Sequence, residues 1–208
     1  MKKIEMFSIA LTITIVLVAI FLPTVLKHSG SNHALLAMSG AAEGGTAGKT
    51  LVAYFSRSGN TRIIAEEIRE LTGSDIFEIE TVDPYPSGYR ETTEQVQKEL
   101  EENFRPLLRT SKVPGLESYD TVFIGYPIWW GRIPPALMTF LDENDLSGKT
   151  MAPFCTHGGS RFGSSVDDLR KLAPGTKILD GLELSGSRVE NARKEVKSWL
   201  EKLGLPQG

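Results

Sequence analysis

Beyond Lys49 the chain alternates short apolar runs with longer segments whose apolar residues recur at helical spacing. This alternation is typical of a parallel sheet with helices on both faces, because each parallel crossover needs a long connection. The apolar runs predict five strands, at residues 51–55, 75–80, 121–126, 150–155 and 177–184. Continuous runs such as LVAYF suit strands buried on both faces, whereas DIFEIE alternates and is expected at an edge. The predicted fold is α/β and doubly wound, with five parallel strands in the order 2-1-3-4-5.

The segments between the runs predict the helices of this fold. Their patterns place helices at 61–71, 89–104, 135–141 and 165–172. A last helix ends at Gly204 and Pro206. Its apolar stripe consists of Val189, Ala192, Val196, Trp199, Leu200 and Leu203.

The N-terminal part has a different composition. Residues 6–26 form an uncharged run of twenty-one residues after Lys2, Lys3 and Glu5, and this length is enough to span a bilayer. We therefore expect residues 1–27 to be a bacterial-type signal peptide or membrane anchor, with the anchor favoured because a signal-peptide core is usually shorter. Residues 28–48 are rich in Gly, Ser and Ala and predict a flexible linker. Residues 49–208 would then be a membrane-anchored or exported domain outside the cytoplasm.

Charge and cysteine content exclude several classes of protein. The chain has 23 basic and 26 acidic residues and no basic cluster, which argues against a nucleic-acid partner. Cys155 is the one cysteine, so the chain has no internal disulfide and no metal site built from cysteines. Cys155 and His157 are also too close along one strand to face each other as nucleophile and base. We expect no bound metal.

Three loops follow predicted strands, and the first has the composition of a phosphate site. It consists of Ser56, Arg57, Ser58, Gly59, Asn60 and Thr61. Hydroxyl groups and glycine at the start of a helix offer side-chain and backbone donors, together with the positive end of the helix dipole, to a dianion. Ordinary helix capping is the alternative, but capping needs only one such residue.

The second loop consists of Pro127, Ile128, Trp129, Trp130 and Gly131. Two tryptophans in a short turn after a buried strand suit the stacking of a flat aromatic ligand, although both rings could instead pack over helix ends. Neighbouring side chains diverge, so we expect only one ring to stack. Trp130 is favoured because Gly131 frees the backbone beside it.

The third loop consists of Thr156, His157, Gly158, Gly159 and Ser160 and continues through Arg161 to Gly163, with the first four as the candidate site residues. Adjacent glycines let backbone amides approach a ligand closely, although a glycine turn made for geometry alone is the alternative. In the predicted strand order, the strands that carry the three loops are neighbours, so the loops meet at the switch point of the sheet. Together they describe a site for a mononucleotide with a flat ring.

The segments FSRSGNT, DPYPSGY, GYPIWWG and FCTHGGSRFGSS resemble the flavodoxin family, specifically flavodoxin-like proteins whose second loop contains PIWWG. The resemblance covers residues 49–203. It implies non-covalently bound FMN, with Ser56, Ser58, Gly59, Asn60 and Thr61 at the phosphate. It also implies that Trp129 or Trp130 lies against the isoalloxazine and that the backbone of His157, Gly158 and Gly159 meets its pyrimidine edge.

This resemblance makes FMN-dependent electron transfer the leading function, with no side chain acting as a covalent catalyst. An FMN-dependent NAD(P)H or quinone oxidoreductase is one alternative, and a membrane-tethered flavodoxin-like interaction module without flavin is another. The electron acceptor is expected to be a redox partner protein or a small molecule. A partner protein could dock on the predicted acidic helix, which carries Glu91, Glu94, Glu99, Glu101 and Glu102.

Overall fold

The computed structural model describes residues 48–205. The predicted leader or anchor at residues 1–27 lies outside the described residues, and so does the predicted linker apart from Gly48. Within the described part, no helix is both long and apolar enough to cross a membrane. All the strands that the sequence predicts lie between residues 48 and 205.

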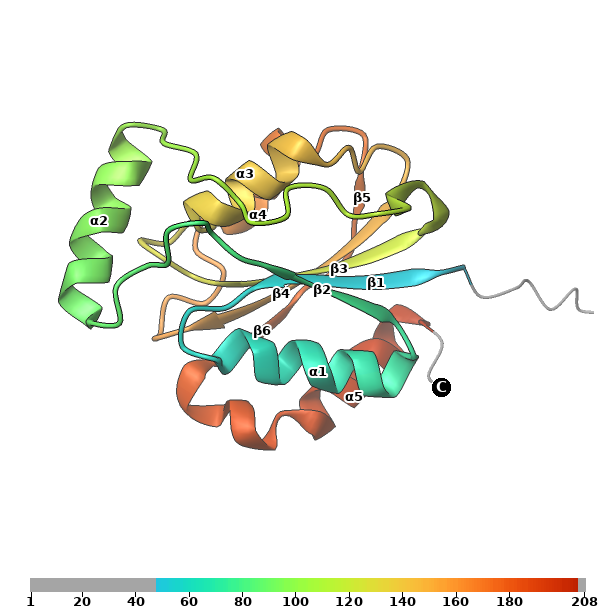
Figure 1. The fold of residues 1–208 in the computed structure, drawn as a ribbon. Coiled ribbons are helices and arrows are strands. Elements are labelled where there is room, and N and C mark those ends of the chain that lie inside the picture. Colours follow the sequence, from blue (N-terminus) through green and yellow to red (C-terminus); the bar gives the residue numbers. More distant parts are fainter. Residues whose placement is uncertain (1–47, 206–208) are drawn as a thin grey trace, which may run out of the picture. The chain divides into compact units, whose positions relative to one another are not determined.

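The described residues build a parallel sheet whose strand order, β2-β1-β3-β4-β5, is the predicted one (Figure 1). The edge strand β2 is the segment whose alternating pattern predicted an edge. The strands are β1 (Thr50–Phe55), β2 (Asp75–Ile79), β3 (Thr121–Pro127), β4 (Thr150–His157), β5 (Lys177–Ile178) and β6 (Leu182–Ser185).

The fifth predicted strand is divided into two short strands, so the expectation of one continuous strand at 177–184 was wrong. Both β5 and β6 pair with β4, with Met151 opposite Ile178 and Phe154 opposite Leu182. Between these two pairs, Ala152 and Pro153 of β4 lie opposite the three residues 179–181, which separate β5 from β6. Pro153 has no N–H to donate to a ladder, and the pairing is interrupted at this position.

Helices cover both faces of the sheet. Figure 1 shows α1 and α5 on one side and α3 and α4 on the other. The α-helices are α1 (Asn60–Thr72), α2 (Tyr89–Glu101), α3 (Pro135–Glu143), α4 (Ser165–Leu172) and α5 (Arg193–Leu203). Two short 3-10 helices, η1 (Leu116–Ser118) and η2 (Gly186–Asn191), complete the described elements.

The second and the last predicted helices differ most in extent from the sequence prediction. The helix expected to reach residue 104 ends at Glu101, because Asn103 adopts a left-handed backbone (φ 52°) and Phe104 N–H bonds back to the Glu99 carbonyl. The last predicted helix begins as η2 and continues as α5. Val189 on η2 and Val196 on α5 nevertheless belong to the same core cluster, so the apolar stripe is continuous across the two helices.

Strand β1 shows why the sheet needs both helical layers. Leu51, Ala53 and Phe55 belong to one core cluster, whereas Val52 and Tyr54 belong to the cluster on the other face. Strand β3 pairs in parallel with β1 on one side and with β4 on the other, with Pro127 opposite Thr156. The carboxyl ends of β1, β3 and β4 therefore lie side by side, and the loops that follow them share one edge of the sheet.

Candidate functional site

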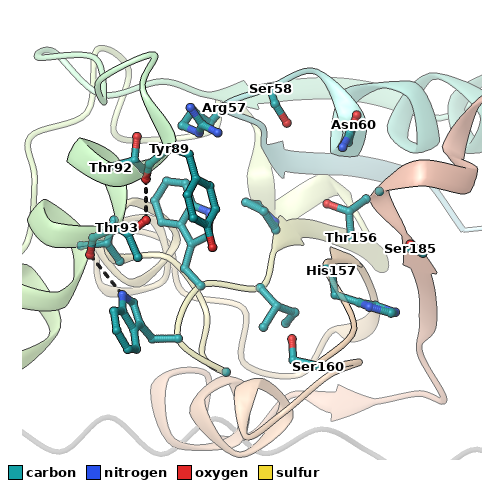
Figure 2. Close-up of a pocket in the computed structure, with 18 of the residues that line it drawn as sticks. Arg57, Ser58, Asn60, Tyr89, Thr92, Thr93, Thr156, His157, Ser160 and Ser185 are labelled. Atoms are coloured by element: carbon teal, nitrogen blue, oxygen red, sulfur yellow. Dashed lines mark hydrogen bonds between the residues drawn. The ribbon is translucent and has the colours of Figure 1, made fainter.

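A cavity of about 720 Å³ opens at this edge of the sheet. All three loops singled out from the sequence border it, together with one face of α2 and the junction of β6 and η2 (Figure 2). The volume lies within the range of about 300–1,000 Å³ that is usual for sites of small molecules and cofactors. The predicted residues that line it are Arg57, Ser58, Asn60, Pro127, Ile128, Trp129, Trp130, Gly131, Thr156, His157 and Gly158.

The first loop presents Arg57, Ser58 and Asn60 to the cavity. Gly59 has a φ of 90°, a left-handed conformation that glycine adopts without strain, and it directly precedes α1. The Nη1 atom of Arg57 donates to the carbonyl oxygens of Pro86 (3.3 Å) and Ser87 (2.9 Å). The loop therefore offers a hydroxyl, a carboxamide and a guanidinium beside the positive end of the helix dipole.

Four predicted site residues do not line the cavity. Ser56 instead accepts a hydrogen bond at Oγ from the Arg62 N–H at 3.3 Å. The buried hydroxyl of Thr61 lies 2.9 Å from that of Thr156, so it ties α1 to β4. Gly59 and Gly159 likewise lie outside the lining. Local sequence could not reveal the bond between Thr61 and Thr156, because it depends on the pairing of distant elements.

The second loop contains a tight turn. Trp129 and Arg132 exchange two backbone hydrogen bonds, and the central residues Trp130 and Gly131 have φ values of 51° and 73°. Positive φ at both central positions is characteristic of a type I′ turn. The Gly131 carbonyl accepts from the backbone N–H of Ser164 at 2.8 Å, which anchors the turn to the start of α4. Backbone strain at a bulky residue such as Trp130 is typical of functional sites.

The two tryptophan rings diverge from this turn. Trp129 packs edge-on against Phe55 and Tyr85, with ring centroids 5.4 Å and 4.9 Å apart. Trp130 is 55% exposed, and its indole Nε1 donates to the Thr93 carbonyl of α2 at 3.1 Å. Trp129 is thus held by the core, while Trp130 joins the turn to α2 and remains open to the solvent.

The third loop is organised around the imidazole of His157. Its Nδ1 accepts a hydrogen bond from the Gly159 N–H at 2.9 Å, and its Nε2 lies 2.5 Å from Oε2 of Glu183 on β6. Arg161 forms an ion pair with the other oxygen of the same carboxylate. The Gly159 amide is therefore engaged within the protein. A Cβ on Gly158 would meet no atom within 4 Å, so the space beside that backbone is open to a ligand.

Cys155 does not take part in this site. Its side chain is buried, and burial raises the pKa of the thiol far above its usual range. The neutral thiol is a poor nucleophile, in agreement with the expectation that Cys155 and His157 do not act as a pair.

Sequence reasoning missed two sets of lining residues. Helix α2 contributes Tyr89, Thr92, Thr93 and Val96. Their spacing follows one helix face, which is a signal that could have identified them. The segment from Ser185 to Ser187 is the second set. Ser160 also lines the cavity; it belongs to the predicted third loop but was not among the predicted site residues. The segment from Ser185 to Ser187 directly follows the strand predicted at residues 177–184, just as the three predicted loops follow their strands. This position was a signal that could have identified it, but the sequence analysis did not single it out.

The acidic face proposed for α2 is smaller than the sequence suggested. Glu99 is buried and accepts a hydrogen bond at Oε2 from the Tyr85 hydroxyl at 2.7 Å. Burial and this carboxylate both raise the pKa of Tyr85 strongly. Glu91, Glu94, Glu101 and Glu102 remain exposed.

The charge of the cavity is unlike that of the whole chain, which has a formal net charge of −3. Among the described residues that line the cavity, none is Asp or Glu, and Arg57 contributes a permanent positive charge. Figure 2 shows Tyr89, Thr92 and Thr93 on one side, with Asn60, Thr156 and Ser185 on the other. One end is therefore aromatic and the other is rich in hydroxyl groups, which suits a ligand with a flat ring and an anionic group.

Comparisons with known proteins agree with this architecture. The sequence profile described as Flavodoxin matches residues 49–203. A candidate flavoprotein of Bacteroides eggerthii has 34% sequence identity and a TM-score of 0.67, and the match covers 76% of this chain and 99% of that one. A candidate flavoprotein of Bacteroides uniformis has 33% identity and a TM-score of 0.66, with coverage of 74% and 98%.

A flavoprotein of Lactobacillus acidophilus in complex with FMN is also similar, with 25% identity and a TM-score of 0.57. That match covers 69% of this chain and 97% of the other. No curated protein is significantly similar to the chain. The profile match, the Bacteroides relatives and the strand order together show that this chain belongs to the flavodoxin family.

Proposed function

We propose that this chain is an FMN-binding electron-transfer protein. Membership of the flavodoxin family and the FMN complex of the Lactobacillus acidophilus relative support FMN as its cofactor. The observation that carries the proposal is the convergence of three separate loops on one cavity whose ends differ in chemistry.

The residues of the cavity fit the two ends of FMN. The exposed ring of Trp130 and the face of α2 supply an apolar surface for the isoalloxazine. Ser58, Asn60 and Arg57 supply a hydroxyl, an amide and a positive charge for the phosphate. None of the described residues that line the cavity has a carboxylate, which would repel the phosphate dianion.

When bound, FMN supplies reversible transfer of one or two electrons. The work of the protein is to hold and orient the cofactor. Backbone groups at Gly158 are accessible to the polar edge of a ring, and the tryptophan turn limits access of water to one of its faces. An electron-rich indole beside the ring disfavours added negative charge, so Trp130 lowers the reduction potential.

A second candidate is an FMN-dependent NAD(P)H or quinone oxidoreductase. The observation that favours it is the exposure of two aromatic rings at the cavity, Tyr89 at 80% and Trp130 at 55%. Exposed aromatic side chains of this kind suit the docking of a second flat molecule. As a carrier, the protein would instead use the same opening and the exposed acids of α2 to dock a redox partner protein.

Titration of the full-length chain, purified in detergent and freed of flavin, tests the proposal. FMN fluorescence should be quenched on binding, and FMN should bind more tightly than riboflavin because the phosphate adds charge-assisted hydrogen bonds. A colourless protein that binds no FMN would support the flavin-free interaction module. Turnover of a quinone with NAD(P)H would distinguish the oxidoreductase from the carrier.

We further propose that residues 1–27 anchor the domain in a membrane or direct its export. The support is the uncharged run at residues 6–26, which is long enough to span a bilayer.

A further inference from the structure

The junction of β6 and η2 lies at the hydroxyl-rich end of the cavity and adds a second set of hydroxyl groups there. It consists of Ser185, the last residue of β6, and of Gly186 and Ser187, the first two residues of η2, and all three line the cavity. In the sheet register His157 is the partner of Ser185, so β6 ends at the same edge as the loops already described. This segment lies far along the chain from the loop that contains Ser58 and Asn60.

Gly186 places the backbone of this segment directly against the first loop. A Cβ at Gly186 would lie 2.7 Å from Nδ2 of Asn60, which is closer than real Cβ contacts. The same position lies 3.9 Å from the His157 carbonyl oxygen. Glycine therefore lets the two loops meet, and a side chain here would displace Asn60 from the wall of the cavity.

The two serines form a hydrogen-bonded pair, with their Oγ atoms 3.0 Å apart. A hydroxyl group has one donor hydrogen, so this bond uses one of the two hydrogens and leaves the other available. With Arg57 lining the same cavity and no carboxylate among the described lining residues, an anion is the preferred acceptor for that hydrogen.

We propose that Ser185 and Ser187 bind the phosphate of the ligand, as a second wall beside Ser58 and Asn60, and so select phosphorylated over unphosphorylated flavins. The proposal rests on the proposed function, because it assigns these residues to one group of the same cofactor. Gly186 is the positioning residue that allows the second wall to reach the first.

The test compares the full-length protein with the double variant Ser185→Ala/Ser187→Ala. FMN should bind at least about tenfold more weakly to the variant, since a hydrogen bond to a charged group is worth about 1.5–3 kcal/mol. Riboflavin affinity should change by less than about twofold, because riboflavin lacks the phosphate. Gly186→Ala keeps both hydroxyls but crowds Asn60, and it should also weaken FMN selectively.

Ser118→Ala/Ser147→Ala is the matched control. Both serines precede strands at the opposite edge of the sheet, and each donates a hydrogen bond to a backbone carbonyl. This pair should leave both affinities unchanged. Thermal unfolding of every variant shows whether the fold is retained.

Unchanged FMN affinity in the serine double variant would overturn the inference. Equal weakening of FMN and riboflavin would also overturn it, because the serines would then support the loop and not the phosphate. Broadening of the 31P signal of inorganic phosphate provides a readout without flavin. If the wild-type protein binds no FMN but broadens this signal, and the serine double variant does not, the proposed function is wrong but the assignment of Ser185 and Ser187 to a phosphate is retained. If neither ligand binds, both fail.

Discussion

The imidazole of His157 and the carboxylate of Glu183 are joined by a 2.5 Å contact between Nε2 and Oε2. Because Nδ1 of the same ring accepts the Gly159 N–H, the proton of the neutral imidazole lies on Nε2 and is donated to Glu183. One side chain thus links β4 to β6 and also holds the glycine loop beside the cavity.

This double role predicts different effects for two substitutions of His157. His157→Asn keeps an acceptor for the Gly159 N–H but does not reach Glu183, and it should lower the free energy of unfolding by about 1–2 kcal/mol. His157→Gln keeps a donor toward Glu183 but releases Gly159, so it should retain more stability and lose more FMN affinity. Chemical denaturation and FMN titration measure the two effects, and identical behaviour of the variants would contradict the assignment.

The divergence of the two tryptophans predicts separable functions. Trp129→Ala removes the ring packed against Phe55 and Tyr85, and it should cost about 2–3 kcal/mol of stability. Trp130→Ala removes an exposed ring, so it should change stability little but weaken FMN by about 1–3 kcal/mol. It should also raise the reduction potential, as measured by redox titration.

The backbone of Trp130 provides a control for this comparison. Its φ of 51° strains alanine but not glycine. Trp130→Gly should therefore give a flavin-free protein about 1 kcal/mol more stable than Trp130→Ala, with the same loss of FMN affinity. Unequal FMN affinities would show that the turn, and not the ring, determines binding.

Two hydroxyl residues of the first loop should behave differently. The hydroxyl of Thr61 is bonded to Thr156, so Thr61→Val should lower stability by about 1–2 kcal/mol because it leaves a buried group without its partner. Ser58 lines the cavity, and Ser58→Ala should weaken FMN with little loss of stability. A larger effect of Thr61→Val on the preference for FMN over riboflavin would place Thr61 at the phosphate after all.

Cys155 should be inert in the folded protein. Its burial excludes reagents, and its raised pKa keeps the thiol protonated at pH 8. Iodoacetamide should therefore modify it only in denaturant, as mass spectrometry would detect. Rapid labelling of the native protein would mean that the end of β4 opens.

Removal of residues 1–48 should leave a soluble domain that unfolds cooperatively, because all the described helices and strands lie beyond Gly48. Aggregation or non-cooperative melting would contradict this boundary. In the full chain, membrane fractionation and the size of the mature protein distinguish an anchor from a cleaved leader.

The amino-acid sequence alone was enough to predict the order and type of the elements. Apolar runs and helical spacing reflect burial of each element against its neighbours, and these local patterns were sufficient for the succession of strands and helices and for the three loops after β1, β3 and β4. The strand order was predicted from the doubly wound fold class that this succession indicates. Motifs confined to single loops, such as the segment from Pro127 to Gly131, were recognisable because their residues are adjacent in the chain. For the same reason, the resemblance to flavodoxins can be recognised from the sequence.

The use of individual side chains depends instead on the tertiary structure. Thr61 is engaged by Thr156, the Gly159 N–H is engaged by His157, and Ser185 reaches the cavity, because sheet register brings distant segments together. The interruption opposite Pro153 likewise depends on which residues face each other across two strands. Such contacts depend on pairings between elements that are far apart in the chain, and local periodicity contains no information about them.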